Sequence, residues 1–161
     1  MNLQKQTEIV ALNDSISNLE LTASKKGISA SLVEGDNGIQ ITCFSEVSHD
    51  DVNLHFQIIR FPKQIYVWIG CNTAKFGHLY AAGPSLSNSA VAVTCLLGGT
   101  SDNTGSGIAR RLVMKTGLNI IVACNIPKNS PMLESEAEKK LMEKLIRLGY
   151  TKPKSQALSS Q

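Results

Sequence analysis

Residues 52–71 have the sequence VNLHFQIIRFPKQIYVWIGC, and this stretch decides the fold class. Apolar and polar side chains alternate over 52–58, which is typical of a strand with one buried face. A tight turn follows at 61–64, and 65–69 is apolar on both faces. Because antiparallel strands are joined by short connections, we predict that 52–58 and 65–69 are antiparallel neighbours.

Two further strands and two helices are predicted downstream. Residues 90–97 and 118–124 are apolar on both faces, as expected of buried strands. Apolar side chains at helical spacing indicate a short helix over 108–113. Ser130-Pro131 begins a second helix, with Ser as N-cap and Pro in the first turn, and Gly149 ends it.

The two ends of the chain differ from this central part. Residues 1–38 contain three lysines and five carboxylates, a net charge of −2, with scattered hydrophobic side chains. We expect a flexible N-terminal extension over 1–38, one domain over 39–150 and a flexible C-terminal tail over 151–161. Within the extension, alternating residues on both sides of the turn at 35–38 also fit a hairpin over 28–44.

The predicted fold class is α+β: a mainly antiparallel β-sheet with two helices on one face. Residues 72–88 carry almost no charge, and only 79–82 resemble an ordered segment. Two helices cover one face of a sheet, so the other apolar face needs a second layer. Charged residues are only 18% of the chain, below the usual ~25%. We therefore expect the other face to pack on a partner's sheet.

Composition argues against several classes of protein. The formal charge is +3, and the longest basic runs are pairs without interleaved aromatic residues, so no nucleic-acid binding is expected. No apolar run is long enough for a membrane helix, and the N-terminus lacks the apolar core of a signal peptide. Four widely spaced cysteines fit buried free thiols. We expect a protein of the cytoplasm and nucleus, with no membrane contact and no cofactor.

A glycine-rich loop over 98–107 precedes the first predicted helix. Backbone N–H groups at a helix N-terminus can bind phosphate, so one alternative is a small nucleotide- or phosphate-binding enzyme. The loop lacks the Lys of a P-loop, and Arg110 stands where the dinucleotide fingerprint needs Gly. A turn and helix-capping role is the favoured interpretation of the loop.

Histidines and acidic residues offer no convincing catalytic or metal site. His55 and His78 lack a positioned nucleophile and orienting group, and His49-Asp50-Asp51 lacks a further ligand at suitable spacing. Arg110 and Arg111 either lie on an exposed helix face or anchor a protein interface. Trp68 suits either the core or a dimer face.

The sequence resembles a known family in two motifs. These are Val67-Trp68-Ile69-Gly70 and the run from Leu96 to Leu112, LLGGTSDNTGSGIARRL. Together with His55-Phe56-Gln57-Ile58-Ile59-Arg60 and Lys115-Thr116, they are similar to the proteasome assembly chaperone 4 family over about residues 39–148. The chain departs from the family pattern at Gly99 and Gly105.

The resemblance implies a non-enzymatic chaperone of 20S proteasome assembly. Such proteins form a heterodimer with proteasome assembly chaperone 3, by packing two sheets face to face. The pair holds an α-type subunit, α5, during α-ring formation. Partner contacts are then expected at six residues: Trp68, Thr100, Ser101, Asp102, Arg110 and Arg111. A homodimeric adaptor without a link to the proteasome is a further alternative.

Overall fold

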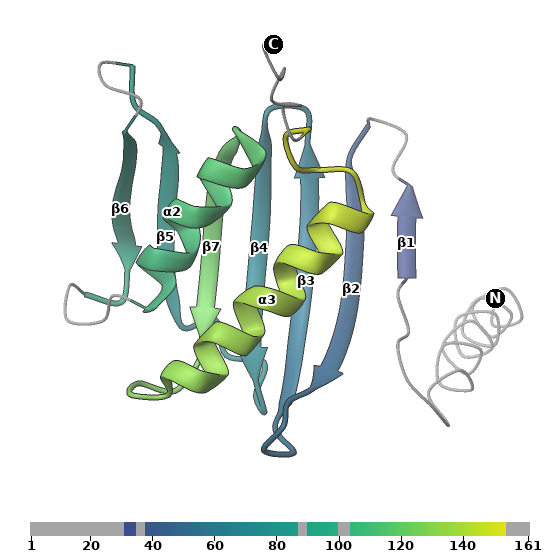
Figure 1. The fold of residues 1–161 in the computed structure, drawn as a ribbon, viewed down its shortest axis with the longest axis vertical. Coiled ribbons are helices and arrows are strands. Elements are labelled where there is room, and N and C mark those ends of the chain that lie inside the picture. Colours follow the sequence, from purple (N-terminus) through teal and green to yellow (C-terminus); the bar gives the residue numbers. More distant parts are fainter. Residues whose placement is uncertain (1–30, 35–37, 87–89, 100–103, 154–161) are drawn as a thin grey trace, which may run out of the picture.

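The computed structural model describes residues 31–34, 38–86, 90–99 and 104–153. These residues form one sheet with two helices across one of its faces (Figure 1), which confirms the predicted fold class. The strand order is β1-β2-β3-β4-β7-β5-β6; β4 and β7 are parallel, and all other neighbours are antiparallel. The elements are β1 (Ser31–Glu34), β2 (Gln40–Val47), β3 (Asn53–Phe61), β4 (Gln64–Cys71), β5 (His78–Pro84), β6 (Val91–Leu97), α2 (Thr104–Thr116), β7 (Asn119–Asn125) and α3 (Pro131–Arg147).

The predicted hairpin of β3 and β4 is present at the centre of the sheet. Phe56 pairs with Ile69, and Ile58 pairs with Val67, so that their side chains share the face below the helices. All four are almost completely buried. The apolar residues of the alternating pattern in the sequence are therefore the ones on this buried face.

The sheet begins upstream of the predicted domain boundary. β1 pairs with β2 in the register Ser31 to Cys43 through Glu34 to Gln40, as the hairpin alternative predicted. Residues 35–37, at the turn, lie outside the described part of the chain. Within the described residues, the first strand of the sheet therefore begins at Ser31 rather than after residue 38.

The second half of the sheet differs from the prediction. Residues 78–84, of which only 79–82 looked ordered, form a complete strand between β7 and β6. Its side chains alternate between the two faces, and Tyr80 and Ala82 are buried on the side of α2. Strand β6 was expected to be apolar and covered on both faces, but it is the edge of the sheet and Leu96 is exposed.

Both helices pack on the same face of the sheet (Figure 1). Helix α2 is longer than predicted and lies over β5, β6 and β7, whereas α3 crosses the sheet diagonally. The Ser130 side chain makes no capping hydrogen bond, and its carbonyl accepts the N–H of Glu134 instead. The helix residues that are almost completely buried in the core are Ile108, Ala109, Leu112, Val113, Ala137, Leu141 and Leu145.

Candidate interaction surface

The face of the sheet opposite the helices has no covering layer among the described residues (Figure 1). Side chains on this face alternate with the core residues, so the strand register defines its rows. The two central cross-strand rows define what we call the open sheet face. The first row is Ile41, Ile59, Tyr66, Ile121 and Ala81, and the second is Cys43, Gln57, Trp68, Ala123 and Leu79.

The open sheet face is largely apolar across five strands. Nine of its ten side chains are half-buried, and Ala123 is fully buried. Burial raises the pKa of the Tyr66 phenol. A continuous apolar area of this kind on a chain without its partners is typical of a protein interface.

Trp68 lies on the open sheet face, in a fixed orientation. Its indole N–H donates a hydrogen bond to the Lys75 carbonyl at 3.1 Å. A Cβ atom on Gly70 would collide with the indole ring, so glycine at this position leaves the space that the ring fills. Trp68, Tyr66 and Phe76 line a hollow of about 590 Å³, and Phe76 is 44% exposed.

One polar pair lies beside this hollow. Ser45 Oγ and His55 Nδ1 share a hydrogen bond of 2.8 Å across β2 and β3. In a Ser-His-Asp triad, the other ring nitrogen faces the serine and Nδ1 faces a carboxylate. Neither nitrogen of His55 contacts a carboxylate within the described residues, so this pair is suited to a polar contact with a partner.

The two arginines predicted as interface anchors both have contacts within the chain. Arg110 Nη1 donates a hydrogen bond of 2.8 Å to the carbonyl of Val91 on the edge strand β6. Arg111 forms a bidentate ion pair with Glu138, and this hydrogen bonding raises the pKa of Arg111. Their side chains therefore tie α2 to β6 and to α3, and both remain exposed at the surface.

The other predicted contacts fall in the glycine-rich loop. Thr100, Ser101 and Asp102 lie outside the described residues. Gly105 belongs to the first turn of α2, and a Cβ atom there would lie 2.5 Å from Tyr80 Cε2. Close packing of α2 on β5 accounts for this glycine without a phosphate ligand.

His49 is part of an ion pair rather than of a metal cluster. Its Nδ1 lies 2.9 Å from Oε1 of Glu136 on α3, and its backbone N–H also faces this carboxylate. No group of three potential metal ligands occurs among the described residues. Within the same residues, no helix is long and apolar enough to span a membrane.

Comparison with known proteins places these features in a family. The family model for proteasome assembly chaperone 4 matches residues 53–126, from β3 to just beyond β7. The human proteasome assembly chaperone 4 is 30% identical over 92 residues, which are 57% of this chain and 74% of the human protein. The chain belongs to the proteasome assembly chaperone 4 family. The mouse protein of the same name is 28% identical with the same coverage.

A solved structure is also similar to this chain. It is a chain from a chaperone complex for yeast 20S proteasome assembly, 17% identical, with a TM-score of 0.40. The match covers 76% of this chain and 93% of the yeast chain.

The part that matches the proteasome assembly chaperone 4 family contains most of the open sheet face. Trp68 was identified from the sequence, but Ile59, Tyr66 and Ile121 in the adjacent row were not singled out. Their period-two spacing within apolar strands was the available signal. The strand order that joins them across β3, β4 and β7 was not readable from local sequence.

Proposed function

We propose that this chain assembles 20S proteasomes as one half of a heterodimer with a proteasome assembly chaperone 3-like subunit. Membership of the proteasome assembly chaperone 4 family supports a role in proteasome assembly. The proposal assigns the chain no enzymatic activity and places it in the cytoplasm and nucleus.

The observation that carries the heterodimer is the open sheet face. It presents apolar side chains on five adjacent strands, while both helices cover the opposite face. Two sheets packed face to face bury such side chains at a spacing of ~10 Å. Tyr66 and Trp68 lie at the centre of this area, where large aromatic residues contribute most to binding.

The heterodimer then holds an α-type subunit, α5, during α-ring formation and leaves as the β ring forms. This contact is assigned to the loop at 99–106 and to the region of Arg110 and Arg111. A polar contact of this kind is smaller and wetter than the sheet interface, which suits a chaperone that must dissociate.

The heterodimer is tested by co-expression with proteasome assembly chaperone 3 and purification through a tag on that partner. Ile59→Asp places a charge on the open sheet face and is expected to abolish co-purification. Met132→Asp is the matched control, because Met132 is an apolar side chain on α3 that is already 79% exposed. A chain that forms a stable homodimer and ignores the partner would support the adaptor alternative instead.

The α-subunit contact is tested with the purified heterodimer and α5. Arg110→Ala and Arg111→Ala are made separately, because each arginine also has a contact within the chain. Capture of α5 should fall for at least one variant whose thermal midpoint shows that it is folded. Unchanged capture by both folded variants would reject the arginine assignment.

A further inference from the structure

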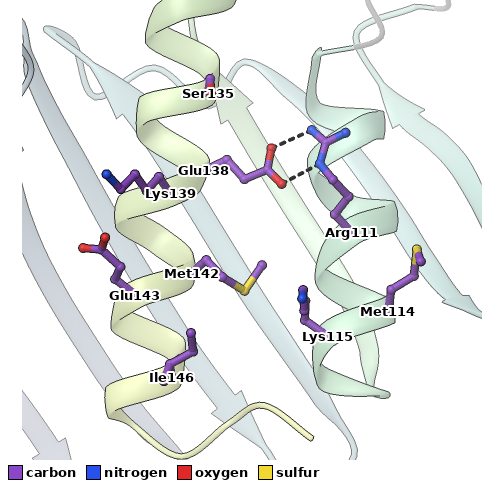
Figure 2. Close-up of a pocket in the computed structure, with 9 residues that line it drawn as sticks. All are labelled: Arg111, Met114, Lys115, Ser135, Glu138, Lys139, Met142, Glu143 and Ile146. Carbon is purple, nitrogen blue, oxygen red and sulfur yellow. Dashed lines mark hydrogen bonds and ion pairs between the residues drawn. The ribbon is translucent and has the colours of Figure 1, made fainter. Parts of the chain in front are cut away.

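A groove of about 570 Å³ lies between α2 and α3 and is lined mainly by apolar atoms. Figure 2 shows Met142 pointing from α3 towards α2, with the Arg111–Glu138 pair near one end and Ile146 near the other. Met114 and Ile146 are 61% and 58% exposed. Methionine side chains adapt to different binding surfaces, so this groove suits the apolar side of a third helix.

The charge around the groove is positive. Helix α2 contributes three cations, Arg110, Arg111 and Lys115, and no carboxylate. Helix α3 contains four carboxylates and four cations, which balance. Of the residues that line the groove, Arg111, Lys115 and Lys139 are cationic and Glu138 and Glu143 are acidic, a net charge of +1. An occupant of the groove should be apolar on one side and acidic.

A segment of the same chain has both properties. Residues 6–24 contain three carboxylates, Glu8, Asp14 and Glu20, and neither Lys nor Arg, so their net charge is −3. Four apolar residues follow the spacing of one helix face: Ile9, Leu12, Ile16 and Leu19. At about 100° per residue, Glu8 and Glu20 fall on opposite sides of this apolar stripe.

We propose that residues 8–20 bind in the groove between α2 and α3 as an amphipathic helix. Thirteen helical residues span about 20 Å, the length of the 13-residue helix α2. Asn, Ser, Ile and Val make up seven of these thirteen residues and favour helix only weakly. An isolated helix of this length is marginal in water, so the segment folds only where its apolar stripe is covered.

The connection to the domain is long enough. Residues 21–30 lead to β1, which begins at Ser31, and ten extended residues span roughly 33 Å. The helices that line the groove, α2 and α3, cross the part of the sheet that contains β4 and β7 (Figure 1), and these strands are three to four places from β1 in the strand order. That displacement is about 20 Å along the sheet and ~10 Å above it, within the reach of the connection.

The proposal is tested in the full-length protein with a photo-cross-linking amino acid in place of Met114. Mass spectrometry of the irradiated monomer should find the cross-link within residues 8–20. Leu12→Asp places a charge on the apolar stripe and should lower the yield roughly tenfold or more. Leu21→Asp is the matched control, because Leu21 lies outside the stripe, and its yield should stay within about twofold.

Charge reversal separately tests the proposed attraction between the cations of the groove and the carboxylates of residues 8–20. The double change of Lys115 and Lys139 to Glu should reduce the cross-link, and changing Glu8 and Glu20 to Lys in the same chain should restore it. Cross-links between two chains would overturn the proposal in favour of a second copy in the groove. Absence of cross-links to residues 8–20, or equal loss with both leucine variants, would also overturn it.

Discussion

The guanidinium of Arg111 on α2 and the carboxylate of Glu138 on α3 meet through two hydrogen bonds of 2.5 and 2.6 Å. The two residues are 27 positions apart, and their contact links helices that otherwise touch little. A bidentate ion pair of this kind holds the two helices at a defined distance, and the charges of the two side chains cancel.

Glu138→Gln is expected to lower the free energy of unfolding by about 0.5–1 kcal/mol, since half of the Arg111 side chain is exposed and solvent weakens the pair. Urea unfolding at neutral pH measures the loss. Glu143→Gln is the control, because Glu143 is exposed on the same helix and forms no ion pair with the other described residues. An equal effect of both changes would show that the pair adds nothing specific.

Gly105→Ala should destabilise the fold by about 1–3 kcal/mol, because the new methyl group would lie 2.5 Å from the Tyr80 ring and force α2 away from β5. Thermal unfolding provides the measurement. Gly107→Ala in the same helix meets only the flexible guanidinium of Arg111, at 3.2 Å. Its midpoint should stay near that of the parent or rise, and a larger loss there than at Gly105 would contradict the packing argument.

Glu136 should make the stability of the fold sensitive to acid. Burial opposes ionisation of its carboxyl group, but hydrogen bonds from His49 outweigh this and lower the pKa below its ordinary value of 4.5. A lowered folded-state pKa means that stabilisation is fully present above pH 4.5 and is lost as the pH falls through the folded-state value. Glu136→Gln should therefore be less stable than the parent at pH 6, and the difference should shrink as the pH falls below 4.5. A difference that stays constant as the pH falls would rule out this ionisation as the cause.

Trp68 should report partner binding, because it is the chain's single tryptophan and lies half-buried on the open sheet face. Its fluorescence emission is expected to shift to shorter wavelength when proteasome assembly chaperone 3 is added to the purified chain. Addition of an α-type subunit alone should leave the spectrum nearly unchanged. A shift with the α-type subunit but not with proteasome assembly chaperone 3 would mean that the chaperone partner does not bind the open sheet face.

Nucleotides and inorganic phosphate should not raise the thermal midpoint, because packing on Tyr80 already explains Gly105 in the loop at 98–107. A ligand that binds the folded state raises its stability by mass action. If the thermal midpoint rises with the concentration of one nucleotide, the alternative of a nucleotide-binding enzyme is supported instead.

Local sequence was sufficient for elements whose burial has a clear period. The strands β3, β4 and β7 were predictable because their apolar residues face a continuous core. Strand β5 was not, since Ala81, Ala82 and Gly83 carry little hydrophobic signal. Ala82 lies on the face that α2 covers and Ala81 lies on the open sheet face, so these positions are fixed by pairing with β7 rather than by a local pattern. The position of β5 between β7 and β6 also depends on pairings distant in sequence.

The candidate site was predictable in kind but not in detail. A shortage of charge beside doubly apolar strands indicated a covered sheet face, and Trp68 lies on the face without a covering layer. The contacts of Arg110 with Val91 and of Arg111 with Glu138 join residues 19 and 27 positions apart. Such pairs follow from the placement of α2 in three dimensions, which no local pattern specifies.

The position of β7 has a consequence for synthesis on the ribosome. This strand alone joins the β1–β4 meander to the β5–β6 hairpin in the described sheet, and residues 119–125 are translated after both. Until they emerge, β4 and β5 each expose a strand edge to other nascent chains. The sheet therefore stays in two separate parts until β7 has been synthesised, and up to that point the nascent chain is open to edge-to-edge aggregation.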